Sequence, residues 1–248
     1  MPPTYHSIAY AGFEVANPVT LAAIQALVAR TALPPGAVAL DIGAGAGGVS
    51  VALARDFGLQ VQAIERYPDM ADMIRARAEA ADVSDRVAVV AEGSATALAR
   101  LSPADLIVAL GSTEPAGPGV RSADAIFAKL ADSLASPGWL LWGDLTWKGD
   151  PPQPLRQVIA AAGDYATHDG WLAAAQAAGL DVVAAEIAPD ADWDAFFGGA
   201  DARVRDWLDA HSDHPSASSI RQRADLSKAT FDFGREWLSF GLYLFRKA

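Results

Sequence analysis

The chain has 248 residues, a formal net charge of −11 and no cysteine. The absence of cysteine excludes disulfides, thiolate metal sites, iron–sulfur clusters and a cysteine nucleophile. The excess of acids argues against a nucleic-acid partner, because phosphate neutralisation requires a basic surface. The sequence has no run of about 18 apolar residues and no basic-then-apolar leader, so we expect no membrane association and a cytoplasmic location.

Apolar runs alternate with helical patterns over the first 150 residues. Residues 17–31 begin with Asn17 and Pro18, residues typical of an N-cap and a first helical position, and continue with apolar residues at helical spacing. Helices are also expected from Val49 to Phe57, at 69–81 and near 121–135. Short apolar runs predict buried strands at 38–40, 61–64, 87–90, 106–110 and 139–142, the last following a turn at Pro137–Gly138. This alternation favours a parallel sheet covered on both faces.

The later part of the chain departs from this rhythm. Residues 167–179 are predicted to be a helix and 181–187 a strand. Residues 189–230 are charged and sparsely apolar, and we interpret them as a loop plus helices inserted before the last strand. Residues 240–245 predict that strand, with alternating faces.

A glycine-rich turn follows the first predicted strand. Gly43, Gly45 and Gly48 have G-x-G-x-x-G spacing, and Glu65 ends the next strand. Glycines allow close approach of a ligand, and a carboxylate at that place accepts hydrogen bonds from ribose hydroxyls. The order predicts a nucleoside-containing cofactor, the alternative being a tight turn with a surface Glu. Asp41, just before the first glycine, would be unfavourable beside a pyrophosphate and suits a cationic cofactor such as S-adenosylmethionine.

These segments resemble the Rossmann-like (class I) S-adenosylmethionine-dependent methyltransferases. The resemblance covers roughly residues 17–188 and the last strand, and its most specific part is VALDIGAGAGG at 38–48. The further similar segments are VQAIE (61–65), DRVAVVAEGSA (85–95), DLIVALGST (105–113) and LASPGWLLWGD (134–144). The family implies an α/β fold with a doubly wound, mostly parallel seven-stranded sheet and an antiparallel last strand.

We expect one methyltransferase domain over residues 1–248. Within it we expect an N-terminal helical cap (1–36), a cofactor-binding core (37–188), a helical insert or lid (189–235) and the last strand (236–248). The expected reaction is methyl transfer to the nitrogen or oxygen of a small molecule. The alternatives are an NAD(P)-dependent oxidoreductase and a cofactor-binding regulator without transfer activity.

The resemblance also implies a set of cofactor contacts. Asp41, Gly43 and Gly45 would line the methionine end, Glu65 would hold the ribose, and Arg66 would lie against the adenine. Many family members have Gly-Asp-Ala in the third loop, where this chain has Gly93, Ser94 and Ala95; Ser94 can accept a hydrogen bond but supplies no charge. The remaining expected contact is Leu110, at the end of the fourth strand.

The acceptor is expected at the carboxyl ends of the strands, where ligands bind in open α/β sheets. Asp144 is the candidate catalytic residue, its alternative being a loop cap; Thr113 and Trp147 are candidate substrate contacts, and Trp147 alternatively packs under the insert. After the fourth strand there is no Asn-Pro-Pro-Tyr-type motif, which marks amino methylation of bases and glutamine. No metal is expected, because His6, His168, His211 and His214 lack the spacing of a metal site and the acids at 190–201 match a calcium loop poorly.

Overall fold

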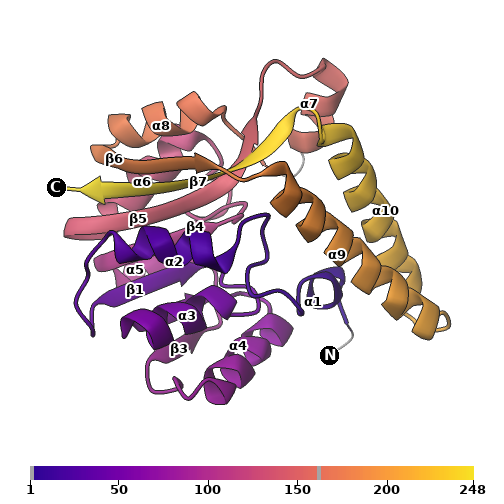
Figure 1. The fold of residues 1–248 in the computed structure, drawn as a ribbon, viewed down its shortest axis with the longest axis horizontal. Helices are drawn as coiled ribbons and strands as arrows, with labels where there is room; N and C mark the ends of the chain where they lie inside the picture. Colours follow the sequence, from indigo (N-terminus) through magenta and orange to yellow (C-terminus); the bar gives the residue numbers. More distant parts are fainter. Residues whose placement is uncertain (1–2, 161–162) are drawn as a thin grey trace.

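The structure is a computed structural model that describes residues 3–160 and 163–248. Its seven-stranded sheet has the order β3-β2-β1-β4-β5-β7-β6, and β7 runs antiparallel to both of its neighbours while the other pairs are parallel. This confirms the predicted doubly wound sheet with an antiparallel last strand (Figure 1). The strands are β1 (Val38–Ile42), β2 (Gln60–Ile64), β3 (Val87–Val90), β4 (Ala104–Leu110), β5 (Leu134–Trp147), β6 (Leu180–Ile187) and β7 (Leu238–Lys247).

Helices cover both faces of the sheet. The apolar sides of α2, α3 and α4 pack on one face, and those of α5, α6 and α8 pack on the other. The central strands are therefore buried on both sides, which explains their largely apolar sequences. The helices are α1 (Tyr5–Ala9), α2 (Leu21–Ala29), α3 (Gly48–Phe57), α4 (Pro68–Ala80), α5 (Ser94–Leu101), α6 (Ala123–Asp132), α7 (Gln153–Ala160), α8 (His168–Ala177), α9 (Asp190–Ala210) and α10 (Ala217–Gly234).

Several predicted elements differ from the observed ones. Thr20, and not Asn17, caps α2, because its hydroxyl accepts from the Ala23 amide at 3.1 Å. The segment from Ser94, interpreted as a loop, is helix α5, and α7 was not predicted. The predicted turn at Pro137–Gly138 lies inside β5, where the register against β4 shifts.

The last strand is buried from Leu238 to Phe245, so the expected alternation of faces is wrong. The reason is its place in the sheet: β7 lies between β5 and β6, and both of its faces are covered.

Helices α9 and α10 form a hairpin beside the sheet, with α1 against α9 (Figure 1). A small apolar cluster of Ala9, Val204 and Ile220 joins the three helices. The acidic run that begins at Asp190 is the first turn of α9 and not a loop. Among the residues that the structure describes, no helix has the length and apolar character that a bilayer crossing requires.

Residues 11–19 connect α1 to α2 and form what we call the N-terminal strap. Arg77 of α4 donates from Nη2 to the carbonyl oxygens of Ala11 (2.6 Å) and Phe13 (2.9 Å). The guanidinium of Arg203, from α9, lies 4.2 Å from the centre of the Phe13 ring. The strap is thus held by the core and by the helical hairpin.

Candidate functional site

The carboxyl ends of β1 to β4 border one cavity of about 480 Å³, which we call the glycine-loop cavity. It has the size of a small-ligand pocket. Of the residues predicted from sequence, those that line it are Gly43, Gly45, Glu65, Arg66, Ser94, Leu110 and Thr113. The predicted residues outside its lining are Asp41, Ala95, Asp144 and Trp147.

The glycines of the turn are required at their positions for different structural reasons. Gly43 and Gly45 have positive φ angles of 70° and 57°, which side chains with a Cβ rarely adopt. A Cβ on Gly43 would lie 3.3 Å from Ser112 Oγ, on the side of the cavity. Gly48 faces the protein instead, since a Cβ there would lie 2.0 Å from the carbonyl oxygen of Glu14 in the strap. The third glycine therefore allows the strap to cross the loop.

Glu65 is fixed by the backbone around it. Its Oε2 accepts from the Gly45 amide at 3.0 Å, and its Oε1 accepts from the Tyr67 amide at 2.9 Å. The residue is 7% exposed, and burial raises the pKa of its carboxyl while these amide hydrogen bonds oppose the rise. Each oxygen keeps further acceptor capacity, so the carboxylate links the glycine turn to the end of β2 and still presents acceptors.

Asp41 lies below the loop rather than in the cavity. It borders a small void of about 30 Å³ between the strap and the glycine turn, together with Asn17 and Leu110. Ser50 Oγ donates to its Oδ2 at 2.5 Å. Burial raises the pKa of Asp41 to about 6, with the Ser50 hydrogen bond opposing this and the nearby Glu65 adding to it.

The outer wall is built from the ends of β2 and β3. Arg66 donates from Nη2 to the Tyr67 hydroxyl at 2.8 Å. Ser94 donates to the Glu114 carbonyl at 3.0 Å and so ties the start of α5 to the loop after β4. Ala95 packs against the same loop at Gly117: a Cβ added to Gly117 would lie 2.8 Å from the Cβ of Ala95.

A part of the wall comes from the N-terminus and was not predicted from the sequence. His6 and Tyr10 of α1 and Asn17 of the strap also line the cavity. The His6 ring stacks on Tyr67 at 6.1 Å between ring centres. Burial, followed by the charges of Arg223 and Arg66, lowers the pKa of His6. The cluster of aromatic residues at the N-terminus was the available signal, but it does not reveal which surface they cover.

Asp144 and Trp147 lie elsewhere. Asp144 is 6% exposed, and its Oδ1 accepts from the adjacent Leu145 amide at 2.8 Å. Burial raises the pKa of Asp144 to about 8. Trp147 borders a different hollow, beside Thr167 and His168, and packs against the cluster of Ile159, Trp193 and Leu238. The structure therefore does not bring either side chain to the glycine-loop cavity.

A second cavity of about 340 Å³ lies between α9 and α10, and we call it the hairpin cavity. Trp193, Phe197 and Phe231 supply aromatic walls, and Tyr5 of α1 closes one side. The Tyr5 hydroxyl donates to Ser227 Oγ at 3.1 Å. Helix α1 thus contributes Tyr5 to the hairpin cavity and His6 to the glycine-loop cavity.

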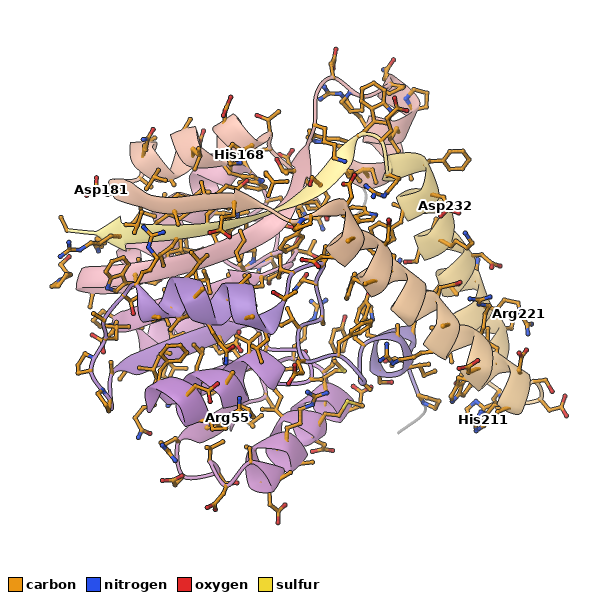
Figure 2. All side chains as sticks on the ribbon, in the orientation of Figure 1. Arg55, His168, Asp181, His211, Arg221 and Asp232 are labelled. Carbon is orange, nitrogen blue, oxygen red and sulfur yellow. The ribbon has the colours of Figure 1, made fainter. Side chains whose placement is uncertain are left out.

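The histidines do not form one cluster, although His211 and His214 both pack against Trp207. His211 lies at the outer end of the helical hairpin and His168 at the start of α8 (Figure 2). The ring of His211 stacks on Trp207 with 4.8 Å between centres. Within residues 3–160 and 163–248, no group of three or more His, Asp and Glu side chains is arranged to hold a metal ion.

Comparison with known proteins identifies this architecture. The family model described as the precorrin methyltransferase domain matches residues 11–146. YjhP of Escherichia coli strain K12 is 27% identical over 245 residues, 97% of each chain. Its X-ray structure superposes with a TM-score of 0.84 at 25% identity and covers 99% of this chain and 100% of that one.

Two S-adenosylmethionine-dependent methyltransferases in complex with S-adenosyl-L-homocysteine are also similar. The enzyme from Geobacter sulfurreducens has a TM-score of 0.84 and 26% identity, and it covers 100% of this chain and 99% of its own. The enzyme from Thiobacillus denitrificans has a TM-score of 0.82 and 25% identity, with the same coverage, 100% and 99%. The predicted cofactor and the predicted enzyme class are thereby confirmed. The chain belongs to the family described as the precorrin methyltransferase domain, and it is an S-adenosylmethionine-dependent methyltransferase.

Proposed function

We propose that the enzyme binds S-adenosylmethionine in the glycine-loop cavity and methylates a nitrogen or oxygen of a small molecule. The proposal rests mainly on one observation: a single cavity is bordered by Gly43, Glu65 and Ser94, which come from three separate motifs of the sequence. In the proposal the adenine lies near Arg66, Ser94 and Ala95, and the ribose lies at Glu65. The methionine part then extends toward Asp41, Gly43, Gly45 and Leu110.

The residues of the cavity fit this cofactor. Gly43 leaves open the space that a side chain would fill, and Glu65 offers acceptors for two hydroxyls. Asp41 and Glu65 are acids beside the glycine turn, where a pyrophosphate would be repelled and a sulfonium and an ammonium are favoured. This charge pattern supports the methyl donor over a dinucleotide.

When bound, the cofactor supplies an already activated methyl group. The protein then has to orient the acceptor and exclude water, and a base is required only for an acceptor that arrives protonated. Thr113 lines the cavity and is the proposed acceptor contact. The hypothesis that Asp144 acts in catalysis and Trp147 in substrate binding remains a prediction, and the separation of both from the cavity does not support it.

The acceptor is proposed to be small because the cavity is covered. Residues of α1 and the strap line it, and α9 and α10 pack against α1. We therefore assign α1 and the strap as a cap, and residues 189–235 as a lid, over the core. Helix α2, which the expected cap of residues 1–36 included, belongs to the core instead, because it packs on a face of the sheet. Such a cover favours an acceptor small enough to be enclosed, and it disfavours a folded protein or a nucleic acid duplex. The net charge of −11 also disfavours a nucleic acid.

The test uses S-adenosylmethionine with a tritiated methyl group. The enzyme is incubated with a cell extract divided into a small-molecule ultrafiltrate, a protein fraction and an RNA fraction. A carboxylated tetrapyrrole is added as a separate probe, because the family description names precorrins. We expect label in the ultrafiltrate or the probe, and none with Gly43→Val. Label in protein or RNA alone, or in no fraction while the cofactor binds, would contradict the proposal.

A further inference from the structure

The side chain of Asn17 holds the strap at the end of β4. Its Nδ2 donates to the Leu110 carbonyl oxygen at 3.2 Å, across 93 residues of sequence. Since a carbonyl only accepts hydrogen bonds, the amide nitrogen has to face Leu110 and the amide oxygen has to face away. The orientation of the side-chain amide is thereby fixed.

The amide oxygen of Asn17 lies over Gly111. A Cβ on Gly111 would be 2.0 Å from Asn17 Oδ1, and the φ of Gly111 is +61°. The Gly111 amide does not serve this oxygen, because it donates to the Gly143 carbonyl at 2.7 Å. Within residues 3–160 and 163–248, no protein donor reaches Asn17 Oδ1. The position thus combines a glycine that makes room with an acceptor that has no partner.

Asn17 is also shared between two spaces. It lines the glycine-loop cavity with Gly43 and Leu110, and it lines the small void with Asp41. A carboxyl that is 4% exposed and an amide oxygen therefore border the same corner. Such a corner favours a ligand cation with N–H donors.

The order of the strands indicates which part of the cofactor reaches this corner. The neighbours along the sheet edge are β3, β2, β1 and β4. With the adenine at β3 and the ribose at Glu65 of the β2 end, the remaining amino-acid part has to pass Gly43 toward β4. We infer that Asn17 is a cofactor-binding residue whose amide oxygen accepts a hydrogen bond from the ammonium group of the methionine part. This inference rests on the proposed cofactor position and not on the proposed acceptor.

The test compares two ligands by titration calorimetry. S-adenosylhomocysteine carries the ammonium, and 5′-methylthioadenosine has the same adenosine and a thioether but no amino-acid part. We expect Asn17→Ala to raise the Kd for S-adenosylhomocysteine about tenfold or more, which is the effect of losing one hydrogen bond to a charged group. Binding of 5′-methylthioadenosine should change less than about twofold. Asn17→Asp loses the donor to the Leu110 carbonyl, as the Ala variant does, but keeps an acceptor oxygen, so it should keep the preference for S-adenosylhomocysteine.

Two controls separate binding from the strap's structural role. Thr20→Ala removes the α2 cap next to the strap, outside the cavity lining, and should leave both affinities unchanged. Asn17→Leu keeps the side-chain volume and replaces Asn17→Ala if that variant does not fold. Equal weakening of both ligands, equal losses in the Ala and Asp variants, or no loss would overturn the inference. Wild-type enzyme that binds S-adenosylhomocysteine but methylates no fraction would contradict the proposed acceptor and leave this inference intact.

Discussion

Replacement of Glu65 by Ala should weaken cofactor binding in a way that the structure explains. With the ribose in its proposed place, the variant leaves the ribose hydroxyls without the carboxylate acceptor, and the amides of Gly45 and Tyr67 lose their acceptors as well. A hydrogen bond to a charged group contributes about 1.5–3 kcal/mol. Part of this is recovered by water in the space left behind, so we expect a loss of about 1–3 kcal/mol, or roughly 5- to 150-fold in Kd.

The conservative variant Glu65→Gln is a sharper test. Both carboxylate oxygens accept from backbone amides, so a Gln would have to direct its NH₂ at one of these N–H donors. We expect the Glu65→Gln enzyme to bind S-adenosylhomocysteine more weakly than the wild type, although the Gln side chain is similar in shape to Glu.

The assay is titration calorimetry with S-adenosylhomocysteine on variants shown to be folded by circular dichroism. Glu92→Ala is the matched control, because Glu92 is another acid of the cavity wall and pairs with Arg100 outside it. It should change Kd less than about threefold, as expected for an exposed ion pair. Unchanged affinity in Glu65→Ala, or equal losses in both variants, would refute the reasoning.

Three further predictions concern the glycine loop and the buried acid. Gly43→Val should abolish S-adenosylhomocysteine binding in calorimetry while circular dichroism shows a folded chain, because its side chain would enter the cavity beside Ser112; normal binding would place the cofactor elsewhere. Gly48→Ala should mainly lower the thermal midpoint, since its Cβ would lie 2.0 Å from the Glu14 carbonyl oxygen and displace the strap; an unchanged midpoint would contradict this packing. Burial raises the pKa of Asp144 from 3.8 to about 8, so between about pH 4 and pH 8 the folded chain holds a proton that the unfolded chain has lost, and stability falls as the pH rises. Urea unfolding at pH 5 and pH 8 should show a smaller fall for Asp144→Asn than for the wild type, and equal falls would show that this carboxyl does not titrate in the window.

The core of the fold was predictable because its signals are local. Each strand from β1 to β4 is mostly apolar, although polar residues such as Asp41 and Gln62 interrupt three of them, and mostly apolar segments are typical of strands buried on both faces. The role of the glycine turn and of Glu65 in cofactor binding was predicted from the order of strand, turn, helix and strand. The alternation expected for β7 failed because its two faces pack in different clusters: Leu242 and Leu244 lie in the cluster that includes α2 and α3, and Tyr243 and Phe245 lie in the cluster that includes α6 and α8.

The missed parts of the site depend on distant contacts. Asn17 matched a helix-capping pattern, but its partner is Leu110, and no local pattern reveals a contact over such a separation. Gly48 matched the cofactor fingerprint, yet the structure explains it by the approach of Glu14. Asp144 was expected just past the end of the fifth strand, but β5 continues to Trp147. The pleat of β5 therefore places the Asp144 side chain on the same face as Trp142 and Tyr243.

A crystal structure of the enzyme with S-adenosylhomocysteine would show directly whether the cofactor occupies the glycine-loop cavity. We expect the ribose hydroxyls to lie within hydrogen-bonding distance of the Glu65 carboxylate, and the sulfur to lie between Gly43 and the end of β4. The amino group should lie within hydrogen-bonding distance of Asn17 Oδ1. A ligand in the hairpin cavity, or one with its ribose away from Glu65, would contradict the proposed cofactor position.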